Sequence, residues 1–360
     1  MNVQPVLWAA PLAEVTDSAF RAMAFGCGAD RCTTEMVSAA GLSRGSEASF
    51  ALLERLPEER GETFAQLYGS DPGEMEEAAR RVVALGRFQG LDLNAGCPAP
   101  KVLRVGGGAA LLGDLALLRR LVAALVRGAG GALPVSVKTR VGPDPARPIA
   151  AELARIAEGE GAACVALHGR YASARHSGPC DWTQVAAAVA AVRIPVFANG
   201  GIRSPEDAIA ALRETGAAGL MVGRGAVGCP FLFGEIRSAL AGAPPPAPAL
   251  PPNETAAGAT PPSAATLARR VAPIADVVAA VRRHLALSLA LKRQMKAAHP
   301  AACTSDPELA VALDFRRHVF TYFRNRPGAS ALRRRLNDLR TPDAILAAIA
   351  DCFPGARETD

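Results

Sequence analysis

Short apolar runs alternate with amphipathic stretches along the first 225 residues of the chain. The stretches, such as "GEMEEAARRVVALG", are rich in Ala and repeat apolar residues at helical spacing. The runs are three or four residues long and predict strands at 6–9, 31–34, 64–67, 91–93, 135–138, 164–167, 196–198 and 220–222. Strands that alternate with helices form parallel sheets, and eight such units predict an α/β fold of the (β/α)8 TIM-barrel type.

The remainder of the chain has a different pattern. The segment "APPPAPALPPNETAAGATPPSAA" is rich in Pro and Ala, without periodicity, and indicates a linker. Beyond it, apolar residues return at helical spacing between clusters of Arg. We therefore predict a catalytic barrel over 1–240, a linker over 241–265 and a small basic helical domain over 266–360.

The charge is concentrated in this last part. The whole chain has a formal net charge of +6, whereas 266–340 contains fifteen Lys or Arg and five Asp or Glu. A basic helical region next to a nearly neutral body favours a polyanionic partner such as nucleic acid. The alternative is an ordinary solvated helix surface in an Arg-rich chain.

Other classes of protein are disfavoured. No apolar run approaches the length that a membrane span needs, and the N-terminus lacks the pattern of a secretory signal. The eight cysteines are scattered and form no CxxC pair, which argues against a zinc site or a disulfide scaffold. We expect a cytoplasmic protein without a membrane partner or a metal, and the pattern is compatible with a monomer.

Polar residues and glycines cluster where the predicted strands end. In a TIM barrel the chemistry takes place at these C-terminal strand ends. They carry Pro11, Glu35, Gln66, Asn94 with Cys97, Lys138 with Arg140, His168 with Arg170, Asn199–Gly201, and Gly223 with Arg224. So many polar groups in one place would cost stability without a ligand.

Two of these ends predict a phosphate site. The "NGG" and "GRG" turns offer backbone N–H groups without obstructing side chains, and Arg224 adds a charged fork. Lys138 needs an anion or an electron-rich ring beside it, unless it extends out to solvent. His168 faces the same ligand or is a hydrogen-bonded core residue. With Gln66 able to bind a flat heterocycle, the set indicates flavin mononucleotide (FMN).

Several blocks, in this order and spacing, resemble the tRNA-dihydrouridine synthases. They cover residues 6 to about 237 and read "APLAEVTDSAFR", "TEMVSAAGL", "FAQLYGSDP", "DLNAGCPAPKVLRVGGGAALL", "VSVKTRVG", "LHGR", "FANGGI" and "MVGRGAVGCPFLF". The segment "RRHVFTYFRNRPGASALRRRLN" is similar, more loosely, to the family's helical RNA-binding domain.

The resemblance implies an enzyme that reduces the C5=C6 bond of particular uridines in tRNA, with FMN as cofactor and NADPH, or NADH, as reductant. It implies Cys97 as the acid that protonates C5 while C6 receives hydride from the flavin, and Asn94 as a uracil contact. It implies flavin contacts at Pro11, Leu12, Ala13, Gln66, Lys138, His168, Asn199, Gly200, Gly201, Gly223 and Arg224. A thiol suits the acid's role because it is neutral at pH 7 and still able to release a proton. Cys97 could otherwise be a small buried residue beside a turn.

The chain departs from the family pattern at two places. Leu12 stands where the family usually has Met, an apolar exchange that should preserve the flavin wall. After "HGR" the chain reads "YASARHSGPCDW" in place of the usual Thr, Gln and Tyr pattern. We expect Arg140, Tyr171 and Arg175 to contact the RNA there.

The basic tail would hold the rest of the tRNA. We expect Arg316, Arg317 and Arg324 to bind phosphates in a salt-dependent way, while Phe320, Tyr322 and Phe323 belong to the core. Two other functions remain open on the residues alone. One is a flavin barrel acting on a small pyrimidine, as dihydroorotate dehydrogenases do, and the other is a non-catalytic RNA-binding protein.

Overall fold

The computed structural model describes residues 4–243 and 272–354, and its first part is a closed parallel barrel. The strands are β1 (Val6–Ala9), β2 (Arg31–Thr33), β3 (Val37–Ser38), β4 (Glu62–Tyr68), β5 (Gly90–Ala95), β6 (Val135–Arg140), β7 (Cys164–His168), β8 (Val196–Asn199) and β9 (Gly219–Val222). Their order is β2-β1-β9-β8-β7-β6-β5-β4-β3, and a further pairing of β2 with β4 closes the ring. The predicted TIM barrel is therefore confirmed.

The second barrel strand is interrupted, which the apolar pattern did not predict. Both β2 and β3 pair with β4, β2 with its start through Arg31 and Glu62, and β3 with its end through Val37 and Leu67. They occupy one barrel position in succession. The break lies at Thr34–Met36, and it directs Met36 into the barrel mouth.

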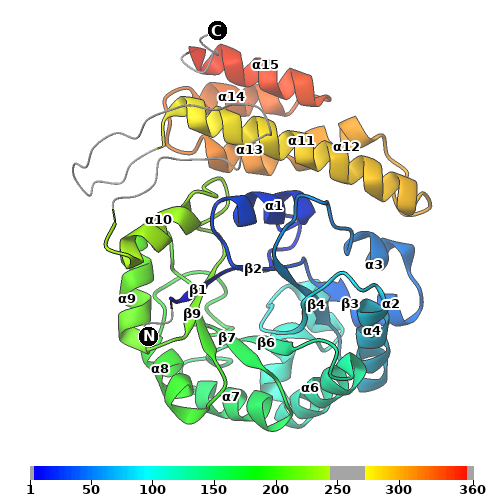
Figure 1. Ribbon diagram of the computed structural model, residues 1–360, viewed down its shortest axis with the longest axis vertical. Helices are drawn as coiled ribbons and strands as arrows, with labels where there is room; N and C mark the ends of the chain where they lie inside the picture. The colour runs from blue at the N-terminus through cyan, green and yellow to red at the C-terminus, as the bar shows by residue number, and fades with distance from the viewer. Residues whose placement is uncertain (1–3, 244–271, 355–360) are drawn as a thin grey trace.

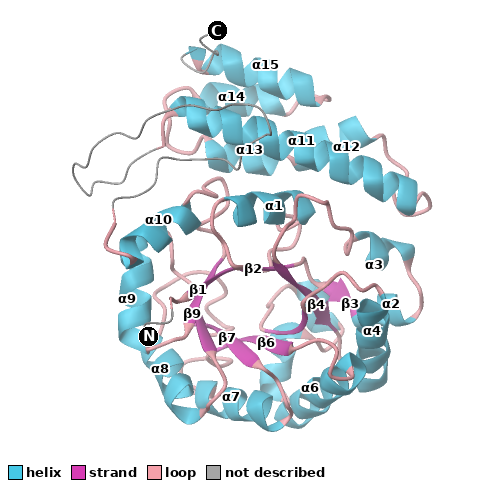
Figure 2. Cartoon of the chain, in the orientation of Figure 1, coloured by secondary structure: helices cyan, strands magenta, loops and turns pink. Residues whose placement is uncertain are grey.

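Helices surround the strands as an outer ring (Figure 2). The ring contains α1 (Ser18–Gly26), α2 (Ala39–Ser43), α3 (Glu47–Ala51), α4 (Pro72–Ala84), α6 (Leu115–Ala129), α7 (Ala150–Gly159), α8 (Trp182–Ala191), α9 (Pro205–Thr215) and α10 (Leu232–Leu240). α5 (Pro100–Arg104) and a 3₁₀ helix (Gly108–Gly113) lie between β5 and α6. α4 illustrates the local cause: Asp71 caps its start, Pro72 follows, and Met75, Ala79 and Val82 form its buried face.

Aromatic side chains fill the inside of the barrel. Trp8 lies against Phe64 and Phe197, with ring centroids 4.8 and 5.2 Å apart, and Met221 completes the cluster. The indole N–H of Trp8 donates to Thr33 Oγ1 at 2.8 Å, so its polar atom is satisfied. Phe64 and Phe197 come from the first halves of their strands, and the opposite end of the barrel is left for the polar groups.

The C-terminal helices form a separate layer beside the barrel, next to α1 (Figure 1). They are α11 (Ile274–Ala298), α12 (Pro307–Asp314), α13 (Arg316–Tyr322), α14 (Ala329–Leu336) and α15 (Pro342–Cys352). Met23 of α1 shares one apolar cluster with Val281 and Phe315 of this layer. Of the predicted linker only 241–243 falls within the described residues, so its extent and the domain boundaries stay predictions. No helix in the described ranges has the length and apolarity that crossing a bilayer requires.

Candidate active site

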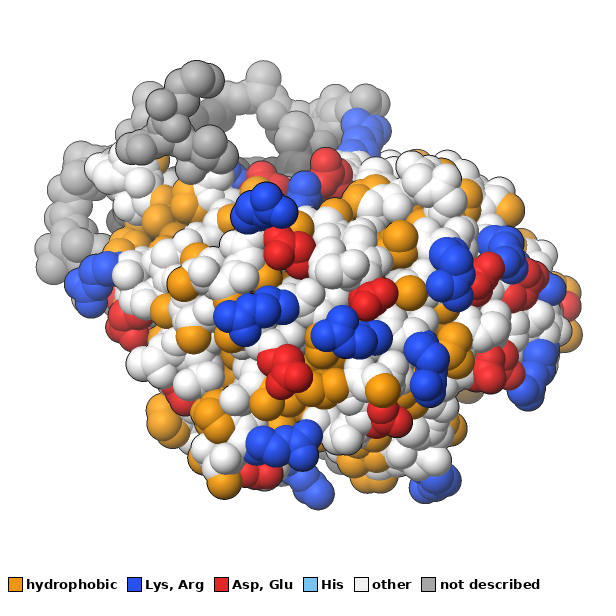
Figure 3. Space-filling view, turned by 90° about the horizontal axis from the view of Figure 1, so that it is seen from below, with side chains coloured by type: hydrophobic (Ala, Val, Ile, Leu, Met, Phe, Trp, Pro, Cys, Tyr) orange, Lys and Arg blue, Asp and Glu red, His pale blue; other side chains and the backbone are white. Residues whose placement is uncertain are grey.

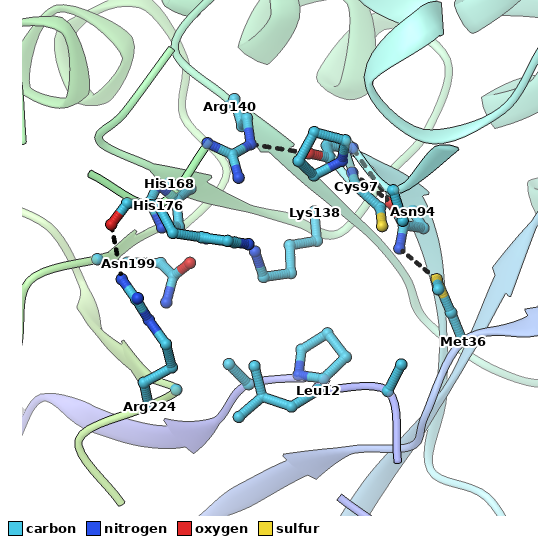
Figure 4. Close-up of a pocket in the computed structure, with 18 of the residues that line it drawn as sticks. Leu12, Met36, Asn94, Cys97, Lys138, Arg140, His168, His176, Asn199 and Arg224 are labelled. Atoms are coloured by element: carbon cyan, nitrogen blue, oxygen red, sulfur yellow. Dashed lines mark hydrogen bonds between the residues drawn. The ribbon is translucent and has the colours of Figure 1, made fainter. Parts of the chain in front are cut away.

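A cavity of about 410 Å³ opens where the barrel strands end, and most of the predicted site residues line it (Figure 4). It brings together Pro11, Leu12, Ala13, Gln66, Asn94, Cys97, Lys138, Arg140, His168, Asn199, Gly200, Gly201, Gly223 and Arg224. These residues come from seven different strand ends, so only the closed barrel gathers them. The volume falls in the range of small-molecule and cofactor pockets.

A chain of buried hydrogen bonds leads to the Cys97 loop. Gln66 donates through Nε2 to Asp92 Oδ2 at 2.6 Å, and its Oε1 accepts from Asn94 Nδ2 at 3.0 Å. The Oδ1 of Asn94 then accepts the backbone N–H of Cys97 at 3.0 Å. Because a carboxylate can only accept, Asp92 sets the orientation of both amides in turn. The loop therefore has one well-defined position, with Cys97 half-buried at the cavity wall.

The sequence analysis missed Asp92, which begins this chain of hydrogen bonds. Its side chain is fully buried in β5 and accepts from Ser136 Oγ at 2.5 Å as well as from Gln66. Burial raises its pKa to about 6, against the opposing effect of these hydrogen bonds and of Lys138. A carboxylate inside the otherwise apolar run "LDLN" was the available signal.

Lys138 extends from β6 into the cavity, as Figure 4 shows. Burial, followed by the charge of Arg140, lowers its pKa to about 8, while Asp92 and Cys97 act in the opposite direction. Within the described part of the chain its ammonium group donates no hydrogen bond. A half-buried ammonium in this condition favours an anionic or electron-rich ligand.

His168 is held as a neutral hydrogen-bond donor. Its Nδ1 accepts the backbone N–H of Arg170 at 3.1 Å, which leaves the proton on Nε2. Burial and then the charges of Lys138 and Arg140 lower its pKa well below the ordinary value. The imidazole is therefore uncharged near neutral pH, and it stands in the wall of the cavity rather than in the core.

Arg140 is held by the two loops that it joins. Its Nε donates to Gly96 O at 2.8 Å, and its Nη1 donates to Tyr171 O and Arg175 O at 3.1 and 2.6 Å. The guanidinium thereby links the Cys97 loop to the atypical segment 171–180. Tyr171 donates its hydroxyl to Asp181 at 2.8 Å, and Arg175 is exposed with a left-handed φ of 49°. Neither of these two residues lines the cavity, so their predicted contacts to RNA stay predictions.

The two glycine turns lie close together at one side of the cavity. Asn199 donates its Nδ2 to Met221 O at 2.6 Å and so ties the end of β8 to β9. Gly200 has a φ of 112°, and a Cβ there would lie 2.9 Å from Cys180 Sγ and 3.2 Å from the His168 ring. Gly225 could not carry a Cβ either, because it would lie 2.3 Å from Ile202 O. The turns therefore present bare backbone.

The charge of the cavity wall is strongly positive. Five cationic side chains line it, Lys101, Lys138, Arg140, Arg203 and Arg224, against the single carboxylate of Glu14. Arg170, whose charge acts on Arg224, adds a buried Nη1 that has no hydrogen-bond partner among the described residues. This electrostatic field suits an anionic ligand. Besides Lys101, Arg203 and Glu14, the lining contains Met36 and His176, which the sequence analysis had not placed in the site.

The three predicted phosphate contacts of the tail have different surroundings. Arg316 donates to Leu339 O at 3.1 Å within the helical layer. Arg317 pairs with the Glu14 carboxylate at 2.6 Å and donates to its carbonyl at 3.0 Å, so it contacts the barrel. Arg324 is exposed. Tyr322 and Phe323 are buried, as expected for core aromatics, whereas Phe320 is half-buried and packs against the same cluster.

Comparison with known proteins shows the family to which the chain belongs. The family model described as "Dihydrouridine synthase (Dus)" matches residues 8–356. A "Probable tRNA-dihydrouridine synthase" of Mycobacterium tuberculosis is 36% identical over 345 residues, 93% of this chain and 79% of that one. The "tRNA-dihydrouridine synthase B" of Xanthomonas axonopodis pv. citri is 32% identical over 98% of this chain and 94% of its own. That of Pseudomonas aeruginosa is 34% identical over 96% and 91%.

Proposed function

The chain belongs to the dihydrouridine synthase family, and from that premise we propose that it is an FMN-dependent oxidoreductase that reduces uridine to dihydrouridine in tRNA. The observation that carries the proposal is that one cavity combines a positioned thiol with a wall suited to a phosphate. A half-buried thiol, Cys97, is positioned by a buried hydrogen-bond chain, and it faces a strongly cationic wall with two bare glycine turns.

The residues present fit FMN. Its phosphate would lie at the glycine turns, where Gly200, Gly201 and Gly223 leave room and Arg224 supplies charge. Arg170 interacts electrostatically with Arg224 and has an Nη1 without a hydrogen-bond partner among the described residues, so it would add positive charge at that side. The flat ring would lie between the wall of Pro11, Leu12 and Ala13 and the polar groups of Gln66, Lys138 and His168.

In this arrangement the protein's own residues supply the proton and hold the substrate. When bound, reduced FMN supplies the hydride that C6 of uracil receives. Cys97 would deliver a proton to C5, so that both atoms of the double bond are saturated. Lys138 and Arg140 lie near enough to Cys97 to interact electrostatically with the thiolate that remains. Asn94, near the end of β5 and hydrogen-bonded to the backbone N–H of Cys97, would hold the uracil.

The flavin must be reduced again, and we propose NADPH as the reductant. The tRNA would be held by the basic helical layer, with Arg324 and Arg317 contacting phosphates. The target uridine would have to leave its stack to reach the cavity, since the reacting atoms cannot be approached within a folded tRNA.

The test is a complementation assay read by mass spectrometry. Unmodified tRNA from a strain without its own dihydrouridine synthases would be analysed after expression of this protein, its Cys97→Ala variant or a Cys303→Ala control. Wild type and control should restore dihydrouridine at defined positions. Cys97→Ala should lower the rate by a factor of about 10² to 10⁴, the usual contribution of a positioned acid, while its visible flavin absorption remains.

Two outcomes would contradict the proposal. A folded, yellow wild-type protein that restores no dihydrouridine would leave a flavin barrel with another substrate, and free pyrimidines such as orotate would be assayed next. A colourless protein that still binds tRNA would point to a non-catalytic RNA-binding protein.

A further inference from the structure

The short helix α5 and Val105 directly after it expose two large apolar side chains, and Lys101 of the same helix lines the cavity. Among the described residues six large hydrophobic side chains are exposed, and two of them lie in this one place, Leu103 at 39% and Val105 at 49%. Val105 is the most exposed of the six. Single exposed apolar residues are ordinary on a protein surface, but two neighbours beside a binding cavity indicate a contact surface.

This exposure does not come from a loosely attached segment. Val102 is fully buried and anchors α5, and Ala109 donates its N–H to Cys97 O at 2.9 Å. Ser70 donates to Val105 O at 2.6 Å. A Cβ at Gly108 would lie 2.5 Å from Cys97 O, so the glycine allows the two segments to touch. Residues 101–105, which we call the α5 rim, are therefore held at a set distance from the Cys97 loop.

The α5 rim also has two cations without partners. Lys101 and Arg104 are exposed, and in the part of the chain that the structure describes neither side chain has a hydrogen bond or an ion pair. Lys101 lines the cavity itself. No Asp or Glu occurs from 93 to 113. The rim is thus positive as well as apolar, and it is continuous with the cavity.

Several cations on the outer helices of the barrel are paired with carboxylates instead. On α4, Arg80 pairs with Glu76 and Arg81 with Glu77, and Arg127 of α6 pairs with Glu76 as well. On the barrel face away from the helical layer, charges of both signs are interspersed (Figure 3). Arg120 of α6 and Arg155 of α7 also lack a partner among the described residues, so what distinguishes the α5 rim is that its unpaired cations lie beside exposed apolar side chains and next to the cavity.

We propose that the α5 rim is the surface that contacts the tRNA next to the target uridine, with Leu103 and Val105 packing against the bases exposed when that uridine leaves its stack. Lys101 and Arg104 would bind the backbone phosphates on either side. Unstacking a base exposes apolar ring faces, and apolar side chains that cover them favour the unstacked state. The inference rests on the proposed function, because it names how that same site receives its substrate.

The experiment separates substrate opening from binding. Flavin in the wild type and in each variant would be reduced with dithionite without oxygen, and its reoxidation by unmodified tRNA transcript would be followed at increasing tRNA concentration. The variants are Leu103→Ala with Val105→Ala, Lys101→Ala with Arg104→Ala, and Ile209→Ala as control. Ile209 lies on α9 of the outer ring. Its side chain is 41% exposed, an exposed fraction similar to the 39% of Leu103.

The apolar pair should lower the reoxidation rate at saturating tRNA by about tenfold or more. The variant without the two cations should instead need a higher tRNA concentration to reach half of its maximal reoxidation rate. It should also reduce the slope of log affinity against log salt by about 1 to 2. Flavin reduction by NADPH should match wild type in the apolar pair and in Ile209→Ala, and the melting temperature should match in all three variants, because the substituted side chains are exposed.

The inference is overturned if the apolar pair behaves like Ile209→Ala at saturating tRNA. It is overturned equally if the apolar pair impairs flavin reduction to the same degree, since the rim would then support the cavity and not the RNA. Failure of wild-type reduced flavin to react with any tRNA is a different result, and it would overturn the proposed function together with the inference.

Discussion

Two sets of charges in this barrel, one fully buried and one at its mouth, are arranged in opposite ways. Arg21 and Glu59, both with fully buried side chains, form a closed pair at 2.8 Å between α1 and the segment before β4. Arg21 also donates to Thr16 O at 2.7 Å, and Glu59 accepts from Ser18 and Thr63, each at 2.5 Å. Among the described residues, Lys138 at the mouth of the barrel has no hydrogen bond, and Arg170 keeps one buried nitrogen without a partner.

This difference in hydrogen bonding distinguishes charges that stabilise the fold from charges that are available to bind a ligand. A buried ion is tolerated when every polar atom has a partner, and an incomplete set costs stability. The Arg21–Glu59 pair is complete within the protein. The cations at the barrel mouth would be completed only by an anionic ligand, as the proposed FMN would provide.

The largest effect is expected at the closed pair. Glu59→Gln leaves Arg21 buried without a countercharge and should lower the free energy of unfolding by about 3 to 5 kcal/mol. Urea denaturation measures it, with Glu76→Gln as the control, because the surface pair of Glu76 with Arg80 should contribute less than about 1 kcal/mol. Equal losses in the two variants would remove the distinction between the closed pair and a surface pair.

The same pair should make stability depend on pH in the acid range. Burial alone would raise the pKa of Glu59, but the charge of Arg21 and the hydrogen bonds outweigh it and the pKa is lowered. Its stabilising contribution is therefore complete above the ordinary Glu pKa and is lost as the pH falls through the lowered one. Glu59→Gln should flatten the acid limb of the stability curve, and an unchanged limb would assign acid unfolding to other groups.

Substitution of Lys138 should have the opposite effect: it should weaken FMN binding without lowering the stability of the fold. Because its pKa is lowered to about 8, FMN affinity should fall as the pH rises through that value, when the charge is lost. Lys138→Met should bind FMN about tenfold more weakly at pH 7 and lose this pH dependence. Flavin fluorescence quenching measures both, with Arg104→Met as the control, because Arg104 is exposed and does not line the cavity.

Without flavin, the stability of the wild type should rise between pH 8 and the ordinary Lys pKa. The unfolded chain still holds the Lys138 proton in that window while the folded one has released it, so the unfolded state binds more protons. Apo Lys138→Met should be at least as stable as the wild type at pH 7. A variant that unfolds more easily would place Lys138 among the charges that hold the fold.

The smallest effect is expected at the pair of Arg317 and Glu14, whose side chains are 40% and 71% exposed. Arg317→Ala should change the free energy of unfolding by less than about 1 kcal/mol. If Arg317 exchanges Glu14 for an RNA phosphate, the salt slope of tRNA binding should fall by about 1. The control is Arg80→Ala on α4, and the same slope in both variants would leave Arg317 as a contact between helical layer and barrel.

Much of the site could be predicted because a TIM barrel turns linear order into spatial order. Once the apolar runs are read as strands, the residue after each run must lie at the same end of the barrel. Gln66, Asn94, Lys138, His168 and Asn199 were found in this way and do share the cavity. Met36 was not predicted as a site residue, because the apolar pattern does not indicate the break between β2 and β3 that directs its side chain into the cavity.

The sequence by itself determined the positions of the strands and the family, because apolar periodicity and motif spacing are local properties of the chain. The tertiary structure alone decided which charged and polar groups have hydrogen-bond partners within the protein. Arg21 meets Glu59 across 38 residues, Gln66 meets Asp92 across 26, and Arg317 meets Glu14 across 303. A hydrogen bond requires atoms within about 3 Å, and only the closed barrel with its helical layer brings such distant residues that close.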